Sequence, residues 1–194
     1  KWIKEARGLY ILFLDADDYL HENYIVHAIN HLQKTWADFF YPSYQCFGNI
    51  HDIHIMPQFS IPNLLMKNYI IITCIIKKEF LMKSQVRFDE AMGDGLEDRD
   101  FRISCAEKWI SWVSSTLPLV FIRKHTNTRT RFANLKKTEL FAYIYEKHKK
   151  FYKTQLSFFQ LLILRLEFSN TEITHRIVNL LPVRIRHWLK WIHI

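Results

Sequence analysis

Three aspartates stand together where a short apolar segment ends. Tyr10–Leu14 is followed at once by Asp15, Asp17 and Asp18, and this pattern is typical of a buried strand that leads into a loop. Neighbouring carboxylates repel each other unless a cation or hydrogen bonds compensate. Oxygen ligands favour Mg²⁺ or Mn²⁺, and such an ion leaves coordination positions for phosphate. The cluster therefore predicts that Asp15 and Asp17 hold a diphosphate through a metal; the alternative is a solvated turn in which Asp18 caps the next helix.

A second acidic pair, Glu97 and Asp98, stands at the predicted start of a helix. Gly93 and Gly95 precede it, and glycines allow the backbone to approach a substrate closely. One of the carboxylates could then take a proton from a hydroxyl group as a general base. The alternative is structural, because acidic side chains also stabilise the N-terminus of a helix through its dipole.

Histidines offer two further candidate sites. His125 follows a predicted strand and precedes a polar stretch, so it is a candidate third metal ligand or phosphate donor, with a purely structural role as the alternative. His51 and His54 lie three residues apart in a predicted strand, which puts them on opposite faces. We therefore expect no metal site at that pair.

Composition and charge restrict the function further. Glycine occurs only 4 times in 194 residues, and neither GxGxxG nor GxxxxGK[ST] is present, so the sequence has no glycine-rich cradle for a nucleotide. The 3 cysteines show no CxxC spacing, which favours a reducing compartment. Residues 1–100 hold 10 Lys and Arg against 14 Asp and Glu, a net −4, whereas residues 101–194 hold 17 against 5, a net +12. An acidic part that binds a metal and a basic part that meets an anionic surface would explain this asymmetry. The alternative is that the basic part is simply a solvated basic face.

The elements that position these residues alternate between strand and helix patterns. Strands are predicted at 10–14, 38–47, 50–55, 69–76, 112–115 and 119–123, and helices at 22–34, 77–84, from 97 onward and from 135 onward. Gly48 and Asn49 suggest a hairpin between the second and third strands. In the helix at 22–34, Ile25, Val26, Ile29 and Leu32 form the predicted apolar face, and in the helix after 97 that face is formed by Phe101, Cys105 and Trp109. The pattern indicates an α/β fold with a mixed sheet flanked by helices.

Three segments resemble the motifs of glycosyltransferase family 2, whose members have a GT-A fold. Residues 6–18 (ARGLYILFLDADD) are similar to the strand and DxD acid cluster of that family, and residues 87–101 (RFDEAMGDGLEDRDF) are similar to its FDE segment and ED helix start. Residues 121–125 (FIRKH), with the polar loop after them, resemble the strand and loop that close the site. Leu96 replaces a glycine that is usual before the ED pair. The resemblance covers roughly residues 1–130.

This resemblance implies a role for each candidate residue. Asp15 would bind the nucleotide, and Asp17 would bind both the nucleotide and the metal, Mn²⁺ or Mg²⁺, with His125 as a further metal ligand. Asp98 would be the catalytic base, and Glu97 would support the acceptor. The activity expected is transfer of a sugar, with inversion, from a UDP-sugar or related donor to a glycan or lipid-linked acceptor in bacterial surface polysaccharide synthesis.

The resemblance also predicts how the chain is divided. Residues 1–133 would form a GT-A-like domain that lacks its first nucleotide-binding units, followed by a basic helical appendage at 134–194. An inactive truncated remnant or a basic module that binds a membrane surface is the alternative function. Nucleic-acid binding is disfavoured, because no RNP-like or helix-turn-helix pattern is present.

The expected location is cytoplasmic, with peripheral contact at the inner face of the cell membrane. The longest apolar run, Tyr69–Ile76, is far shorter than the ~20 residues of a membrane span. Leu180–Ile194 mixes aromatic, aliphatic and cationic residues, which suits a helix on an anionic membrane. The alternative is that this helix packs on the domain core.

Overall fold

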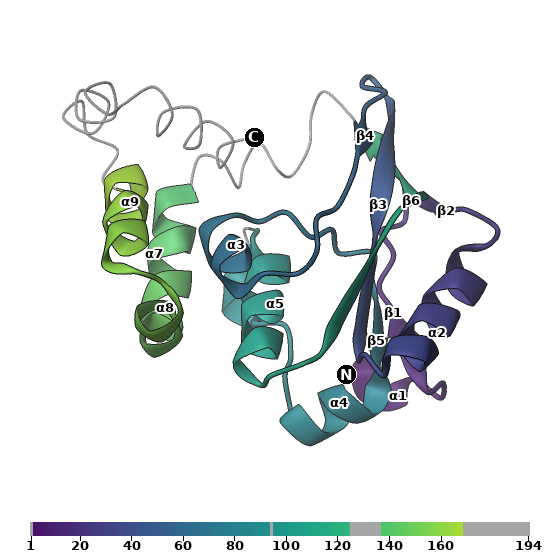
Figure 1. The fold of residues 1–194 in the computed structure, drawn as a ribbon, viewed down its shortest axis with the longest axis horizontal. Coiled ribbons are helices and arrows are strands. Elements are labelled where there is room, and N and C mark those ends of the chain that lie inside the picture. The colour runs from purple at the N-terminus through teal and green to yellow at the C-terminus, as the bar shows by residue number, and fades with distance from the viewer. Residues whose placement is uncertain (1, 94, 125–136, 169–194) are drawn as a thin grey trace.

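The protein folds around one mixed β-sheet with helices on both sides (Figure 1). The structure is a computed structural model, and it describes residues 2–93, 95–124 and 137–168. The sheet order is β1-β5-β3-β6-β2, with β4 paired to β3. The strands are β1 Tyr10–Leu12, β2 Tyr19–Leu20, β3 Phe39–Gly48, β4 Ile53–His54, β5 Ile75–Lys77 and β6 Trp112–Lys124. The α/β class predicted from the sequence is thus confirmed.

Two long neighbouring strands, β3 and β6, form the centre of the sheet. They run parallel from the pair Phe39 and Trp112 to the pair Gly48 and Lys124, whereas the other strand pairs are antiparallel. Side chains of β3 alternate between two cores: Phe39 and Tyr41 lie in one, and Phe40 lies in the other. This alternation follows from the two-residue period of a strand, and it explains why helices can cover both faces.

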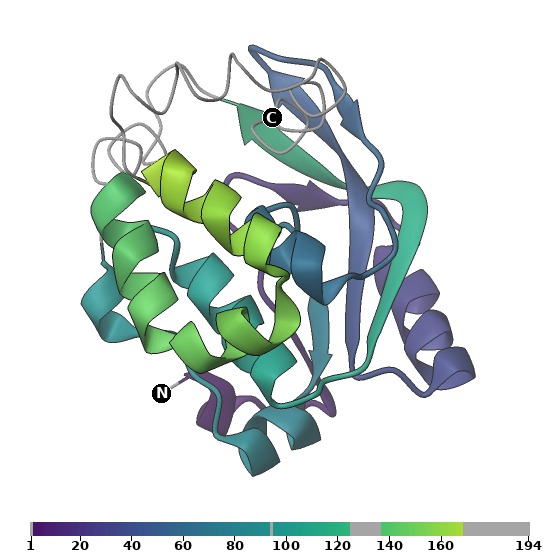
Figure 2. The ribbon, with the colours of Figure 1, turned by 60° about the vertical axis from the view of Figure 1, so that its left-hand side comes forward.

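The helices divide unequally between the two faces (Figures 1 and 2). The helices are α1 Trp2–Glu5, α2 Tyr24–Thr35, α3 Ile61–Met66, α4 Lys78–Ser84, α5 Glu97–Glu107, α7 Lys137–Lys147, α8 Lys149–Gln155 and α9 Phe158–Phe168. Among the described helices, α2 alone covers one face, while α3, α5 and α7–α9 lie on the other. Helices α1 and α4 pack together near one end of the sheet.

The predicted pair of strands around Pro118 is in fact one strand. β6 runs without interruption, and its register against β3 shifts on either side of Ser43. The buried Ser43 hydroxyl donates to the Ser115 carbonyl at 3.0 Å and accepts from the Met56 amide at 2.9 Å. These bonds satisfy backbone groups that the irregular ladder leaves open, so the sheet accommodates Pro118 without ending.

Other sequence predictions need correction, either in the bounds of the element or in the side chains that it buries. The predicted strand at 69–76 is confined to β5, and the predicted buried strand at 10–14 is the short, half-buried β1, which has a strand partner on one side only. Helix α2 packs through Tyr24, Ala28 and Leu32, and Ile25 and Val26 face outward because the sheet lies on the other side of the helix. Trp109 lies beyond the end of α5 and is exposed.

Helices α7–α9 share a hydrophobic core with α5. Ile144, Tyr152 and Leu164 belong to the same buried cluster as Phe101 and Ile103. The division of the chain at residue 133 stays a prediction. The helix predicted at Leu180–Ile194 lies outside the described residues.

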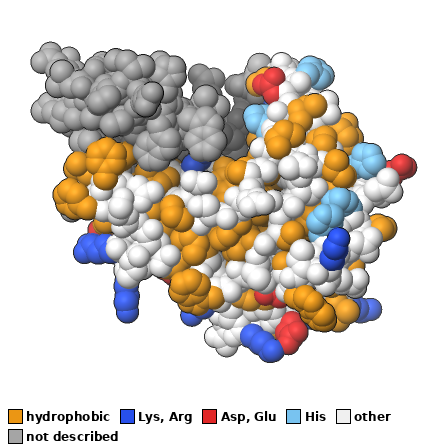
Figure 3. Space-filling model, in the orientation of Figure 1, with side chains coloured by type: hydrophobic (Ala, Val, Ile, Leu, Met, Phe, Trp, Pro, Cys, Tyr) orange, Lys and Arg blue, Asp and Glu red, His pale blue; other side chains and the backbone are white. Residues whose placement is uncertain are grey.

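The described surface has mixed character. In the face shown by Figure 3, hydrophobic side chains cross the middle of the molecule, and Lys and Arg side chains stand apart from one another, many of them near its edges. Among the described residues, no helix combines the length and the apolar character that a bilayer crossing requires.

The hairpin between β3 and β4 yields a stability prediction. Gly48 has a φ of +96°, and a Cβ there would lie 2.8 Å from the Lys124 carbonyl oxygen. Gly48→Ala should therefore lower the free energy of unfolding by roughly 1–3 kcal/mol, measured by thermal and urea denaturation. Gly93→Ala is the matched control, because a Cβ at Gly93 meets nothing within 4 Å. Equal stability of the two variants would contradict the prediction.

Candidate functional site

The acidic loop lies between β1 and β2 and is fastened to the end of β6. The Asp18 amide donates to the Asp15 carbonyl at 3.2 Å, which closes a turn. The Asp18 carboxylate accepts from the Arg123 amide at 2.9 Å. Asp18 therefore does not cap the next helix, as one reading of the sequence proposed; the residue preceding α2 is Asn23. The loop presents Asp15 and Asp17 to solvent.

The charges of this loop act on one another. Burial raises the pKa of the Asp18 carboxyl, the hydrogen bond from Arg123 opposes that rise, and the negative charges of Asp15 and Asp17 add to it. The net shift is upward. The charges of Asp15 and Asp17 therefore make the Asp18 carboxyl harder to ionise, and a cation beside Asp15 and Asp17 would relieve that repulsion.

The fit of a metal ion can be tested on these side chains. Among residues 2–93, 95–124 and 137–168, no three His, Cys, Asp or Glu side chains converge as a metal-binding group. A magnesium-type ion takes one or two protein carboxylates and completes its coordination with water and phosphate oxygens. Asp15 and Asp17 fit that requirement. The other predicted ligand, His125, lies outside the described residues.

Glu97 and Asp98 form the start of α5, as predicted. The preceding Gly95 and Leu96 both have positive φ angles, 128° and 61°, so the chain turns sharply into the helix. Glycine suits this geometry, whereas Leu96 is strained there and must be held by its surroundings. Glu97 and Asp98 are both half-buried.

Asp98 is bound by a buried arginine one turn along the helix. The Arg102 Nη2 atom lies 2.5 Å from Asp98 Oδ2, and the Arg99 amide donates to Asp98 Oδ1 at 2.7 Å. Arg102 Nη2 also donates to Asn68 Oδ1 at 2.5 Å. Burial raises the pKa of the Asp98 carboxyl, but the charge and hydrogen bond of Arg102 outweigh it, and the pKa lies below its usual value. Asp98 is therefore an ionised carboxylate at neutral pH.

Three aromatic rings join the acidic loop to the start of α5. Phe13, two residues before Asp15, packs edge-on against Phe88 and Phe101 with ring centroids 5.2 and 5.7 Å away. Phe88 and Phe101 stack at 4.3 Å. The phenylalanines belong to the two segments singled out in the sequence, so the fold packs these segments against each other although about eighty residues separate their acidic groups.

Of the other candidate histidines, His54 has a structural contact, and His51 is exposed. His54 lies in β4 and stacks on Tyr44 at 4.5 Å. Sequence reasoning missed the buried charges of α5, above all Arg99, Asp100 and Arg102. The available signal was the charge pattern itself, because charged residues occupy positions of α5 that a helix packed on a core usually gives to apolar ones.

Comparisons with known proteins show what part of this sequence and its fold resemble. Residues 1–84 match the family model described as glycosyl transferase family 2. No curated protein matches the sequence. Among solved structures, the fold is similar to that of S. aureus TarS 1-349 in complex with UDP, with a TM-score of 0.57, 16% identity, and coverage of 96% of this chain and 55% of TarS 1-349.

Two further structures of TarS 1-349 give similar values. The complex with UDP-GlcNAc has a TM-score of 0.56 and 16% identity over 73% of this chain and 44% of that one. TarS 1-349 in a third crystal structure has a TM-score of 0.52 and 13% identity over 98% and 64%. The chain thus spans about half the length of the structures that it resembles. Residues 1–84, which include the acidic loop, are thus similar to glycosyl transferase family 2, and the mixed α/β fold of the chain is GT-A-like.

Proposed function

We propose that this protein transfers a sugar from a UDP-sugar to an acceptor hydroxyl group. The observation that carries the proposal is the packing of Phe13 on Phe88 and Phe101, which joins the Asp15 and Asp17 loop to the helix that begins with Glu97 and Asp98. One segment offers carboxylates for a metal-bound diphosphate, and the other offers an ionised carboxylate. The UDP and UDP-GlcNAc complexes of TarS support a uridine nucleotide as the donor.

In this mechanism each acidic group has one task. Asp15 would bind the nucleotide, and Asp17 would hold the nucleotide and a divalent metal, Mn²⁺ or Mg²⁺, with His125 as a further ligand. The metal would neutralise charge on the diphosphate leaving group. Asp98 accepts the proton of the acceptor hydroxyl as its oxygen forms the new bond to the anomeric carbon, and the bond to the UDP oxygen breaks, with inversion. Glu97 supports the acceptor.

A glycan or lipid-linked acceptor at the inner face of the cell membrane completes the proposal. Its support is the net +12 of residues 101–194, since cationic segments are attracted to anionic lipid headgroups. The proposed setting is the synthesis of a bacterial surface polysaccharide. A protein that binds UDP without transferring a sugar is the alternative outcome of the following tests.

Nucleotide binding should depend on the acidic loop. UDP with Mn²⁺ should raise the melting temperature of the wild-type chain, because a ligand bound only by the folded state stabilises it by ~2.7 kcal/mol at one hundred times its Kd. Asp17→Ala should abolish the metal-dependent part of that shift. Asp52→Ala, at an exposed acid in the β3–β4 turn, is the matched control. A shift that is the same in both variants would reject the Asp17 assignment.

Turnover should depend on Asp98. Asp98→Asn removes the proton acceptor and keeps the shape, so release of UDP from UDP-GlcNAc in the presence of acceptor should slow by about 10²–10⁴, while UDP binding persists. Glu79→Gln removes an exposed carboxylate paired with Lys83 on α4 and should leave the rate unchanged. Full turnover by Asp98→Asn would show that another group is the base.

The pH profile should report the ion pair of Asp98 and Arg102. Because Arg102 lowers the pKa of Asp98, activity should persist as pH falls below the usual aspartate value of ~3.9. Arg102→Gln removes the charge that most lowers the pKa of Asp98, so the pKa should rise and the acidic limb of kcat should move to higher pH. Arg102→Lys retains the charge and should move it less. Identical profiles in folded variants, checked by circular dichroism, would contradict this role.

A further inference from the structure

A fully buried carboxylate, Asp100, lies between α5 and the α7–α8 junction. Its side chain has no exposed surface. Lys147 Nζ lies 2.9 Å from Asp100 Oδ2, and His148 Nε2 lies 2.9 Å from Asp100 Oδ1. Asp100 is two residues from Asp98, yet the proposed chemistry gives it no task.

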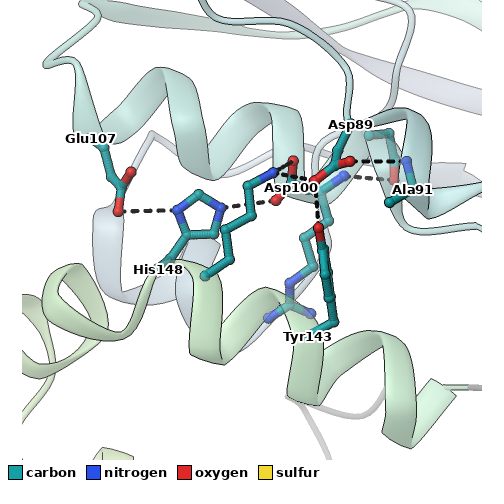
Figure 4. Close-up of polar contacts among 9 residues, drawn as sticks. Asp89, Ala91, Asp100, Glu107, Tyr143 and His148 are labelled. Carbon is teal, nitrogen blue, oxygen red and sulfur yellow. Dashed lines mark hydrogen bonds and ion pairs between the residues drawn. The ribbon is translucent and has the colours of Figure 1, made fainter.

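The two partners of Asp100 extend the network in opposite directions (Figure 4). His148 Nδ1 lies 3.0 Å from Glu107 Oε1 without making a hydrogen bond to it, so one imidazole lies between two acids about two turns apart on α5. Lys147 Nζ also lies 2.6 Å from Asp89 Oδ2, and that oxygen accepts from the Tyr143 hydroxyl at 2.9 Å. The network thus joins α5, the segment before it and the α7–α8 junction.

Because Asp100 is buried, α5 depends on the contact of this residue with the α7–α8 junction. Moving an ionised carboxylate out of water costs free energy unless opposite charges and hydrogen bonds compensate. If one of these partners is removed, the cost is no longer offset. Among the described residues, the side-chain partners of Asp100 are Lys147 and His148, and both lie at the α7–α8 junction. Helix α5 can therefore keep Asp100 buried only while that junction is docked in this position.

The residue between Asp98 and Asp100 is held by the same helices. The Arg99 guanidinium donates to the Leu65 carbonyl at 2.6 Å and lies 4.3 Å from the centre of the Phe141 ring. It also has a hydrogen bond with Tyr152. Successive residues in the first turn of α5 are thus fixed from several directions, directly after the strained Leu96.

We propose that Asp100, His148 and Lys147 are positioning residues that lock the first turn of α5 against α7–α8 and thereby hold Asp98 toward the acceptor. The effect on catalysis rests on the proposed function, whereas the lock itself is a property of the fold. Loss of the lock should loosen the turn that carries Glu97 and Asp98. It should reduce kcat more than it affects binding of the donor, because the donor contacts lie on the β1–β2 loop.

The test compares two substitutions at one position in the 194-residue chain. His148→Phe keeps an aromatic ring and removes both nitrogens, so amide hydrogen exchange at residues 97–100 should accelerate at least about tenfold, with exchange in β3 and β6 unchanged. The kcat for UDP-GlcNAc should fall about tenfold, with KM for the donor within about twofold. His148→Gln can supply a nitrogen toward Asp100 and should restore much of both losses.

Controls separate the lock from general stability. Glu146→Gln removes an exposed ion pair with Lys149 at the same junction and should leave exchange and kcat unchanged. Lys147→Met is the second variant if His148→Phe does not fold, and it should also loosen residues 97–100.

If the amides of residues 97–100 exchange in the variants as slowly as in the wild type, the lock does not exist. Equal losses of protection and kcat in His148→Phe and His148→Gln would also contradict it. If the wild-type chain transfers no sugar, only the proposed function is rejected. Hydrogen exchange would still decide whether the lock exists.

Discussion

The burial of charge along α5 is the constraint on which much of the tertiary arrangement depends. Arg99, Asp100 and Arg102 are almost completely excluded from solvent, and such groups are tolerated only where partners with opposite charge or hydrogen-bonding capacity surround them. The partners come from α3, the segment after it, α7 and α8. Helix α5 consequently sits at the centre of the helical layer, with its N-terminus held by contacts that an apolar helix would not need.

The sheet supplies the other half of the arrangement. The parallel pairing of β3 with β6 separates two cores, and the loop after β1 is tied to the end of β6 through Asp18 and Arg123. Phe13 then connects that loop with α5. The two acidic segments are therefore held by different parts of the fold, one by the sheet and the other by the helical layer. Packing of aromatic rings fixes these two parts against each other.

Local sequence patterns predicted helices and strands well where the burial of a segment follows its own periodicity. The helix at 22–34, the strand at 38–47 and the turn at Gly48 all have counterparts in the structure. Prediction failed where burial depends on distant segments. Ile25 and Val26 look like core residues by spacing, but the position of the sheet selects Tyr24, Ala28 and Leu32 instead. Pro118 looks like a strand break, but β6 continues through it because the hydrogen bond of Ser43 and the irregular register between β3 and β6 accommodate the proline.

The sequence by itself determined the acidic motifs, their order and the α/β alternation, because residue type and short-range periodicity are local properties. It also indicated that Glu97 and Asp98 begin a helix. Only the tertiary structure decided that Asp98 is paired with Arg102, that Asp100 is enclosed by Lys147 and His148, and that the loop of Asp15 packs through Phe13 onto α5. Those contacts join residues up to about ninety positions apart, and their energies come from desolvation and packing, which exist only once the segments meet.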